Sequence, residues 1–161
     1  MILGVIPARL NSTRFPSKVI FPLKGKPIIE HVYDKALQSD LLSKVIVAVD
    51  SEETKNVINC QNIMMTSDKH QSGTDRVAEV ANNFDCDIVV NIQGDEPGID
   101  PLLIDQLITL FDDPNVEMAS IASTDLEEDD LNNDNVVKVN LDKENNAISF
   151  IRNNLNPFQS V

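Results

Sequence analysis

The chain has 161 residues, of which 42% are hydrophobic and 24% are charged, and its formal net charge is −13. This composition is typical of a globular protein with a core of its own, and it excludes collagen-like, coiled-coil and wholly disordered chains. Nucleic acid and anionic membrane would both repel so acidic a surface, so we expect neither as a partner. The sequence shows no signal peptide and no apolar stretch of membrane-spanning length, and a cytoplasmic protein is expected.

The positive charge is concentrated at the start of the chain. Up to Lys26 there are five basic residues and no acidic one, whereas from Val77 to Val137 there is no Lys or Arg. An acidic protein that opens with a purely basic stretch is expected to use that stretch on a specific anion.

Short β-branched runs alternate along the chain with amphipathic helical stretches, which predicts an α/β fold with a largely parallel sheet. We expect one α/β domain over 1–161, incomplete at its C-terminus because no closing helix follows the last strand. The acidic segment 125–134 is expected to be a solvated loop or helix face. In chain order, the predicted elements are a strand at 2–6, a helix at 27–38, a strand at 44–49, a helix at 51–59, a strand at 62–66, a helix at 72–84, a strand at 87–92, a helix at 101–111, a strand at 118–123 and a hairpin formed by 136–141 and 147–151.

Polar segments follow four of the predicted strands. In an open α/β sheet, ligands bind outside the carboxyl ends of the strands, so these segments are expected to meet at one edge. They are residues 7–18 after the first strand, Asp50 after the second, 70–74 after the third and 93–97 after the fourth. Their predicted convergence supports a binding site more strongly than any single motif.

The first polar segment carries Arg9, Arg14 and Lys18, with Ser12 and Thr13 between the two arginines. Guanidinium forks, an ammonium group and hydroxyl donors together suit a polyphosphate. The segment is neither a GxxxxGK[ST] loop nor a GxGxxG fingerprint. A basic surface loop that makes ordinary salt bridges to an acidic body is an equally good interpretation of these residues alone.

Asp95 follows a buried, apolar strand. A carboxylate at this place, facing phosphates, suits Mg²⁺, which takes one or two protein oxygens and completes its shell with phosphate and water. The alternative is a simple turn that begins at Asp95 and Glu96 and ends at Pro97. That alternative is favoured unless a triphosphate lies opposite.

The segment 72–74 opens a helix, where free N–H groups and the helix dipole favour anions or nucleotide carbonyls. Ordinary capping by Ser72 is the alternative, and it is compatible with ligand binding. Arg76 adds a donor one turn further along, while Asp50 is expected either to orient a basic group or to cap the following helix. His70 is expected to be a hydrogen-bonding residue rather than a catalytic one.

Five segments, in order and spacing, carry a resemblance to a known family: Ile6-Pro7-Ala8-Arg9 with 12–18, then 25–28, 70–76, 91–97 and 136–139. Over nearly its whole length the chain resembles the 3-deoxy-manno-octulosonate (Kdo) cytidylyltransferases, also called CMP-Kdo synthetases. The resemblance implies a Rossmann-like nucleotide-diphospho-sugar transferase fold. It also implies a cytoplasmic, Mg²⁺-dependent enzyme that joins CTP and Kdo into CMP-Kdo and pyrophosphate for lipopolysaccharide biosynthesis.

The resemblance further implies roles for individual residues. Arg9, Lys18 and Asp95 correspond to catalytic residues, and Asp95 also corresponds to a Mg²⁺ ligand. Gln93 and Arg152 are similar to contacts of the sugar. The residues that correspond to the nucleotide site are Pro7, Ala8, Arg9, Ser12, Thr13, Arg14, Lys18, Asp50, Ser72, Gly73, Thr74 and Arg76.

Two of the departures of this sequence from the family bear on its function. Family members are considerably longer, and their C-terminal part supplies a second metal-binding aspartate, sugar contacts and much of the dimer surface, so a homodimer is expected for the full-length enzyme. Ile151 stands before Arg152 where the family usually has a serine. Two alternatives to Kdo activation therefore stay open: a CMP transferase for another acidic sugar, and a truncated, non-catalytic nucleotide-binding module.

Overall fold

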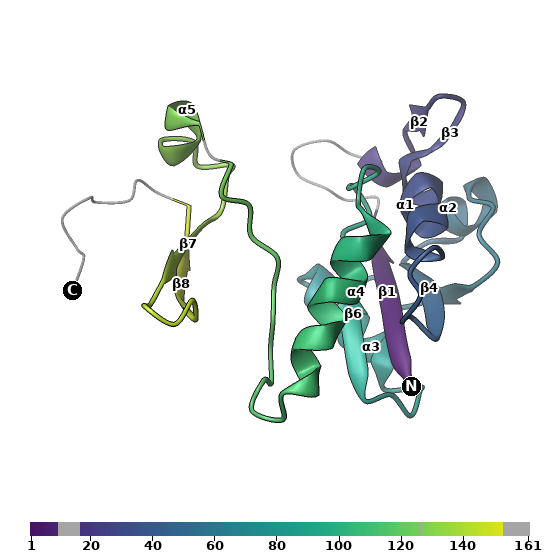
Figure 1. The fold of residues 1–161 in the computed structure, drawn as a ribbon. Coiled ribbons are helices and arrows are strands. Elements are labelled where there is room, and N and C mark those ends of the chain that lie inside the picture. The colour runs from purple at the N-terminus through teal and green to yellow at the C-terminus, as the bar shows by residue number, and fades with distance from the viewer. Residues whose placement is uncertain (10–16, 126, 153–161) are drawn as a thin grey trace. The chain divides into compact units, whose positions relative to one another are not determined.

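The computed structural model describes residues 1–9, 17–125 and 127–152. It divides into two compact units, Met1–Ala119 and Ser120–Val161, which are described separately below (Figure 1). The single α/β domain over 1–161 stays a prediction. Among the described residues, no helix is long and apolar enough to cross a membrane.

The first unit is built on a four-stranded parallel sheet with the strand order β5-β4-β1-β6 (Figure 1). Central in the sheet, β1 places Val5 opposite Ile46 on β4 and Asn91 on β6. Because every pairing is parallel, the carboxyl ends of the strands lie at one edge of the sheet, which confirms the predicted α/β class. The strands are β1 (Ile2–Ala8), β4 (Lys44–Val49), β5 (Ile63–Met65) and β6 (Ile88–Asn91).

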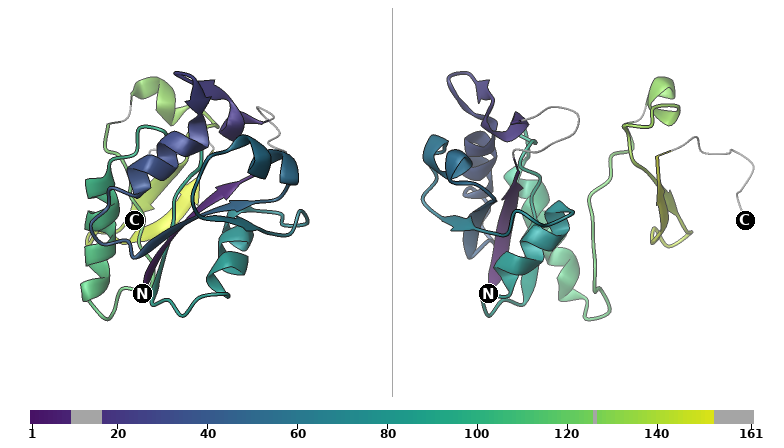
Figure 2. Two further views of the ribbon diagram at one scale, coloured as in Figure 1. Left: turned by 90° about the vertical axis from the view of Figure 1, so that its right-hand side faces the viewer. Right: turned by 180° about the vertical axis from the view of Figure 1, so that it is seen from behind.

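Helices cover both faces of this sheet (Figure 2). On one face, Val32 of α1 and Ile104 of α4 belong to the larger buried cluster. On the other face, Val77 and Val80 of α3 pack against the side chains that point the opposite way from β1 and β4. The helices are α1 (Ile28–Ala36), α2 (Glu52–Val57), α3 (Gly73–Ala81) and α4 (Pro101–Thr109).

The beginnings of α3 and α4 follow from local sequence. At α3, the Ser72 hydroxyl accepts a hydrogen bond from the backbone N–H of Asp75 (3.1 Å), and the Asp75 carboxylate accepts one from the N–H of Ser72 (3.0 Å). This is the predicted capping box. At α4, Asp100 accepts from the N–H of Leu102 (3.0 Å), and Pro101 occupies the first helical position.

Short elements connect β1 to α1. A 3-10 helix at Lys18–Ile20 is followed by β2 (Pro22–Leu23) and β3 (Lys26–Pro27), which pair as a small hairpin. Gly25 lies in its turn with a φ of 85°, a left-handed conformation that glycine adopts without strain. This hairpin is absent from the sequence-based prediction because its strands are too short to show a period. A further 3-10 turn, Leu110–Asp112, extends α4.

The predicted strand at 118–123 is wrong, since these residues form no strand in the structure. Met118 is 89% exposed and Ile121 is 49% exposed. A run of apolar residues forms a strand only where neighbouring strands and a core receive its side chains, and here the side chains face solvent.

The second unit contains α5 (Glu128–Leu131) and an antiparallel hairpin of β7 (Lys138–Leu141) and β8 (Ala147–Ile151). The hairpin confirms the prediction. At its open end, Lys138 is 2% exposed. Its ammonium group donates hydrogen bonds to three backbone carbonyls, those of Asn133 (2.7 Å), Val136 (3.1 Å) and Arg152 (2.8 Å).

Candidate functional site

Three chain segments meet around Pro7, near the carboxyl end of β1. A Cβ added to Gly73, at the start of α3, would lie 3.4 Å from Cγ of Pro7. A Cβ added to Gly94, just after β6, would lie 2.9 Å from the carbonyl oxygen of Pro7. Gly94 therefore allows the segment after β6 to approach β1 more closely than a residue with a side chain could, whereas a Cβ at Gly73 would make an ordinary van der Waals contact with Pro7. The polar segments after β1, β5 and β6 converge as the sequence predicts.

The end of β1 places the first predicted site residues at this edge. Ala8 is fully buried and pairs with Val49 at the end of β4, and Arg9 is exposed directly beyond it. The predicted nucleotide contacts Ser12, Thr13 and Arg14 lie outside the described residues.

Lys18 and Asp95 form an ion pair at the same edge. The Lys18 Nζ atom lies 2.8 Å from Oδ2 of Asp95, and the two side chains are 44% and 39% exposed. A Cβ at Gly94 would lie 3.6 Å from the side chain of Val19, so the 3-10 helix that carries Lys18 packs against the segment that carries Asp95. Two predicted catalytic residues 77 positions apart are thus in contact and open to solvent.

Arg76 and Asp50 form a second ion pair, but a buried one. Arg76 Nη2 donates to Asp50 Oδ2 at 2.9 Å, and the two side chains are 2% and 13% exposed. Arg76 Nη1 donates to the hydroxyl of Thr66 at 2.5 Å. The guanidinium group of Arg76 is thus bonded to Asp50 and to Thr66 within the chain. Direct contact of Arg76 or Asp50 with a nucleotide stays a prediction.

Glu79 of α3 holds the segment between β5 and α3. Its Oε2 atom accepts hydrogen bonds from the backbone N–H of Ser67 (2.9 Å) and from Nε2 of His70. The bond from His70, followed by that from Ser67, lowers the pKa of the Glu79 carboxyl below its usual value. His70 is a hydrogen-bonding residue, as the sequence predicts. Glu79 and Thr66 are missing from the predicted site, and the only signal for either was the position of Thr66 at a strand end.

The donor set around Asp95 limits the kind of metal site it could form. Within the described residues, no three His, Cys, Asp or Glu side chains lie close enough to hold a metal ion. A lone carboxylate does not make a closed protein cage. It does fit Mg²⁺, which takes one or two carboxylates and fills its remaining positions with phosphate oxygens and water.

The two predicted sugar contacts lie in different units. Gln93 is exposed between Asn91 and Asp95, and its amide Nε2 donates to Oδ1 of Asn91 at 3.3 Å. Arg152 belongs to the second unit, where it is exposed and its Nη1 lies 3.4 Å from the carbonyl oxygen of Asn135. Their shared role stays a prediction.

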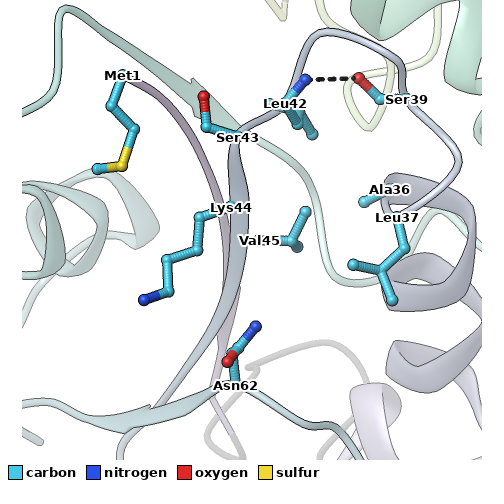
Figure 3. Close-up of a pocket in the computed structure, with 9 residues that line it drawn as sticks. All are labelled: Met1, Ala36, Leu37, Ser39, Leu42, Ser43, Lys44, Val45 and Asn62. Atoms are coloured by element: carbon cyan, nitrogen blue, oxygen red, sulfur yellow. Dashed lines mark hydrogen bonds between the residues drawn. The ribbon is translucent and has the colours of Figure 1, made fainter.

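A separate cavity of about 470 Å³ lies at the opposite, amino end of the sheet (Figure 3). Met1, Ser43 and Lys44 line it near the starts of β1 and β4, and none of the predicted site residues takes part. The Lys44 ammonium lies 5.2 Å from the ring centre of Phe84. The cavity is therefore distinct from the edge where the predicted residues converge.

Comparison with known proteins supports the family suggested by the motifs. The family model described as Cytidylyltransferase matches residues 3–160. A 3-deoxy-manno-octulosonate cytidylyltransferase from Geobacter metallireducens is 43% identical over 161 residues, and one from Trichlorobacter lovleyi is 45% identical over 160 residues. Each alignment covers 98% of this chain and 63% of the relative.

A solved structure shows the same fold. CMP:2-keto-3-deoxy-manno-octonic acid synthetase complexed with CTP matches with a TM-score of 0.83 and 34% identity, over 94% of this chain and 64% of that chain. This likeness confirms the Rossmann-like nucleotidyltransferase fold. The chain spans about 63% of the length of these two curated relatives. Since the family model covers nearly the whole chain, the protein belongs to the cytidylyltransferase family.

Proposed function

We propose that the protein activates Kdo with CTP, forming CMP-Kdo and pyrophosphate. The observation that carries this proposal is the solvent-open pair of Lys18 and Asp95 beside Pro7, because it joins a phosphate-binding cation to a carboxylate suited to Mg²⁺. The names of the relatives, Kdo cytidylyltransferase and CMP-Kdo synthetase, support the choice of nucleotide and sugar.

The proposed reaction is a nucleotidyl transfer. The anomeric hydroxyl of Kdo attacks the α-phosphorus of CTP, the bond from that phosphorus to the bridging oxygen breaks, pyrophosphate leaves, and the hydroxyl proton passes to solvent. Catalysis of such a transfer rests on positioning and on neutralising the charge of the phosphate oxygens. Arg9 and Lys18 supply positive charge at the edge where the triphosphate would lie.

Asp95 would hold Mg²⁺ at the phosphates, and Lys18 would contact the phosphates directly. Mg²⁺ bound at Asp95 would neutralise negative charge on the phosphate oxygens. Lys18 now donates to the Asp95 carboxylate, and in the complex its ammonium would turn to the triphosphate. Because both side chains are partly exposed, this exchange of partners requires no buried charge to be left unpaired.

The start of α3 would hold the cytidine. The first backbone N–H groups of a helix lack partners within the helix, so Gly73 and Thr74 offer donors to the carbonyl groups of a base. Ser72 both caps the helix and lies exposed beside this position. Gln93, on the segment that carries Asp95, would contact the acidic sugar. Sugar binding by Arg152, in the second unit, is a separate part of the proposal.

The same proposal includes the pathway, the cellular location, the oligomeric state and the partners of the protein. The product would serve lipopolysaccharide biosynthesis in the cytoplasm, and the full-length enzyme would be a homodimer. Neither nucleic acid nor membrane would be a partner.

Pyrophosphate release tests the function directly. We expect release from Mg·CTP only when Kdo is added. Release with a different acidic sugar, such as N-acetylneuraminate, and none with Kdo would favour the other CMP transferase. Titration calorimetry with Mg·CTP separates the last alternative: binding without turnover indicates a nucleotide-binding module, and no binding contradicts every nucleotide function.

A further inference from the structure

Arg76 is almost fully buried, and its guanidinium group is bonded within the chain. Its side chain is 2% exposed, and both terminal nitrogens donate to partners within the chain, Asp50 and Thr66. A nucleotide that took the place of Asp50 as partner of the guanidinium group would have to enter this buried position. The carboxylate of Asp50 would then lose its counter-charge in a largely buried position, which is costly.

The partners of Arg76 lie at the carboxyl ends of two strands. Asp50 follows β4 directly, and Thr66 follows β5 directly. Thr66 is itself bonded to the end of β4, because its N–H and its hydroxyl both donate to the carbonyl of Val49, at 2.8 and 2.9 Å. The guanidinium group therefore connects α3 by hydrogen bonds to the ends of both β4 and β5.

The hydrogen bonds from Arg76 to Asp50 and Thr66 hold the beginning of α3 in place. Arg76 lies four residues after Ser72, about one helical turn, so the two ends of that turn move together. The capping box joins Ser72 and Asp75 in this first turn by two reciprocal hydrogen bonds. Gly73 in this turn lies beside Pro7 of β1, where an added Cβ would make an ordinary van der Waals contact at 3.4 Å.

We propose that Arg76 and Asp50 are positioning residues that set the place of the α3 N-terminus, and through it the affinity of the site for the nucleotide, without touching the nucleotide. The inference rests on the proposed function, since it assigns the start of α3 to the cytidine. It differs from a direct contact in one measurable respect: Asp50, a carboxylate that would repel phosphates, should matter as much as Arg76.

The test compares variants on both sides of the pair. Arg76→Lys keeps the positive charge but cannot donate from two separate terminal nitrogens to Asp50 and Thr66. Asp50→Asn keeps the shape of the side chain but loses its negative charge. For each we expect the Kd for Mg·CTP from calorimetry to rise roughly tenfold, because small displacements of positioning groups have effects of this order or larger. The double variant should be no more than about twofold weaker than either single variant, since both changes break one interaction.

A matched control tests whether any ion pair near this edge has the same effect. Lys55 pairs with Glu52 on α2 at 3.5 Å, and both side chains are exposed. Lys55→Gln should leave the Kd for Mg·CTP as in the unaltered protein. An equal loss in this variant would overturn the proposal by showing that general charge, rather than the buried ion pair, controls affinity.

Steady-state kinetics separate positioning from chemistry. We expect the KM for CTP to rise roughly tenfold in both single variants, while kcat stays within about threefold, because the reacting groups are untouched. A loss of kcat at unchanged KM would overturn the proposal. A rise in KM for Arg76→Lys with none for Asp50→Asn would also overturn it, in favour of direct contact.

A milder change covers the case in which these variants fail to fold. Thr66→Val removes the hydroxyl that receives Arg76 Nη1 and that donates to the Val49 carbonyl, whereas Thr66→Ser keeps both bonds. We expect weaker CTP binding in the valine variant and recovery in the serine variant, and equal binding by both would overturn the proposal. If the unaltered protein binds CTP and all variants bind it equally well, only the positioning role fails, whereas absence of binding in the unaltered protein contradicts the proposed function itself.

Discussion

Two ion pairs of nearly equal length lie at one edge of the sheet in different surroundings. Arg76 and Asp50 are 2.9 Å apart and almost fully buried, whereas Lys18 and Asp95 are 2.8 Å apart and 44% and 39% exposed. A buried charge that loses its partner is left without solvent, while an exposed one exchanges its partner for water or a ligand. Burial, rather than distance, therefore separates the pair that holds the fold from the pair that can serve a reaction.

The largest expected effect comes from breaking the buried pair. Asp50→Ala leaves the Arg76 guanidinium without its counter-charge, and we expect the free energy of unfolding to fall by about 3–5 kcal/mol. Urea denaturation followed by circular dichroism measures this. Lys18→Gln, which breaks the exposed pair, should lower the free energy of unfolding by less than about 1 kcal/mol. Equal losses in the two variants would remove the distinction between the pairs.

Changing the exposed pair should affect activity instead. We expect Asp95→Asn to slow pyrophosphate release roughly 100-fold, because it removes the carboxylate that would hold Mg²⁺ at the phosphates, while the free energy of unfolding changes by less than about 1 kcal/mol. Glu96→Gln, the exposed neighbouring carboxylate, is the control and should keep full activity. A rate that is unaffected in Asp95→Asn would refute its role.

The close contact beside Asp95 offers a sharper comparison. A Cβ at Gly94 would lie 2.9 Å from the Pro7 carbonyl oxygen, so Gly94→Ala must shift the segment that carries Asp95. Such overpacking costs about 1–3 kcal/mol of unfolding free energy. Gly98→Ala is the control, because nothing lies within 4 Å of its added Cβ. Thermal unfolding of the two variants should differ clearly, and identical melting temperatures would contradict the close approach.

The smallest effect concerns a third pair, Glu79 with His70. The hydrogen bond from His70, and then that from the N–H of Ser67, lower the pKa of Glu79 from its ordinary value of 4.5. The carboxylate therefore adds stability above pH 4.5, and this contribution is lost as the pH falls through the lowered pKa. The difference in unfolding free energy between the unaltered protein and Glu79→Gln should shrink on acidification. A difference that stays constant from pH 7 to pH 3 would contradict this.

Much of the fold could be predicted from the sequence because its signals are local. The strand at 44–49 is observed with the predicted bounds, and the capping box at Ser72 begins α3 where it was expected. The convergence of Lys18 and Asp95 could also be predicted, since parallel strands bring their following segments to one edge.

The rest depends on tertiary contacts that no local pattern records. Arg76 lies in the first turn of a helix, where a long cationic side chain is usually solvated, and only the fold shows that it is buried against Asp50 and Thr66. The segment 118–123 shows the opposite case: its sequence suits a strand, but it pairs with no strand among the described residues, and Met118 is 89% exposed.

The reactivity of the buried Lys138 amine can be used to measure local opening at the open end of the hairpin. With all three donors of its ammonium group bound to the backbone carbonyls of Asn133, Val136 and Arg152, this buried amine should react slowly with an acylating reagent, because these contacts must first open. Lys143, in the turn of the same hairpin, is exposed and reacts at once. The ratio of the two labelling rates, measured by mass spectrometry, therefore reports how often Lys138 is released from these three carbonyls.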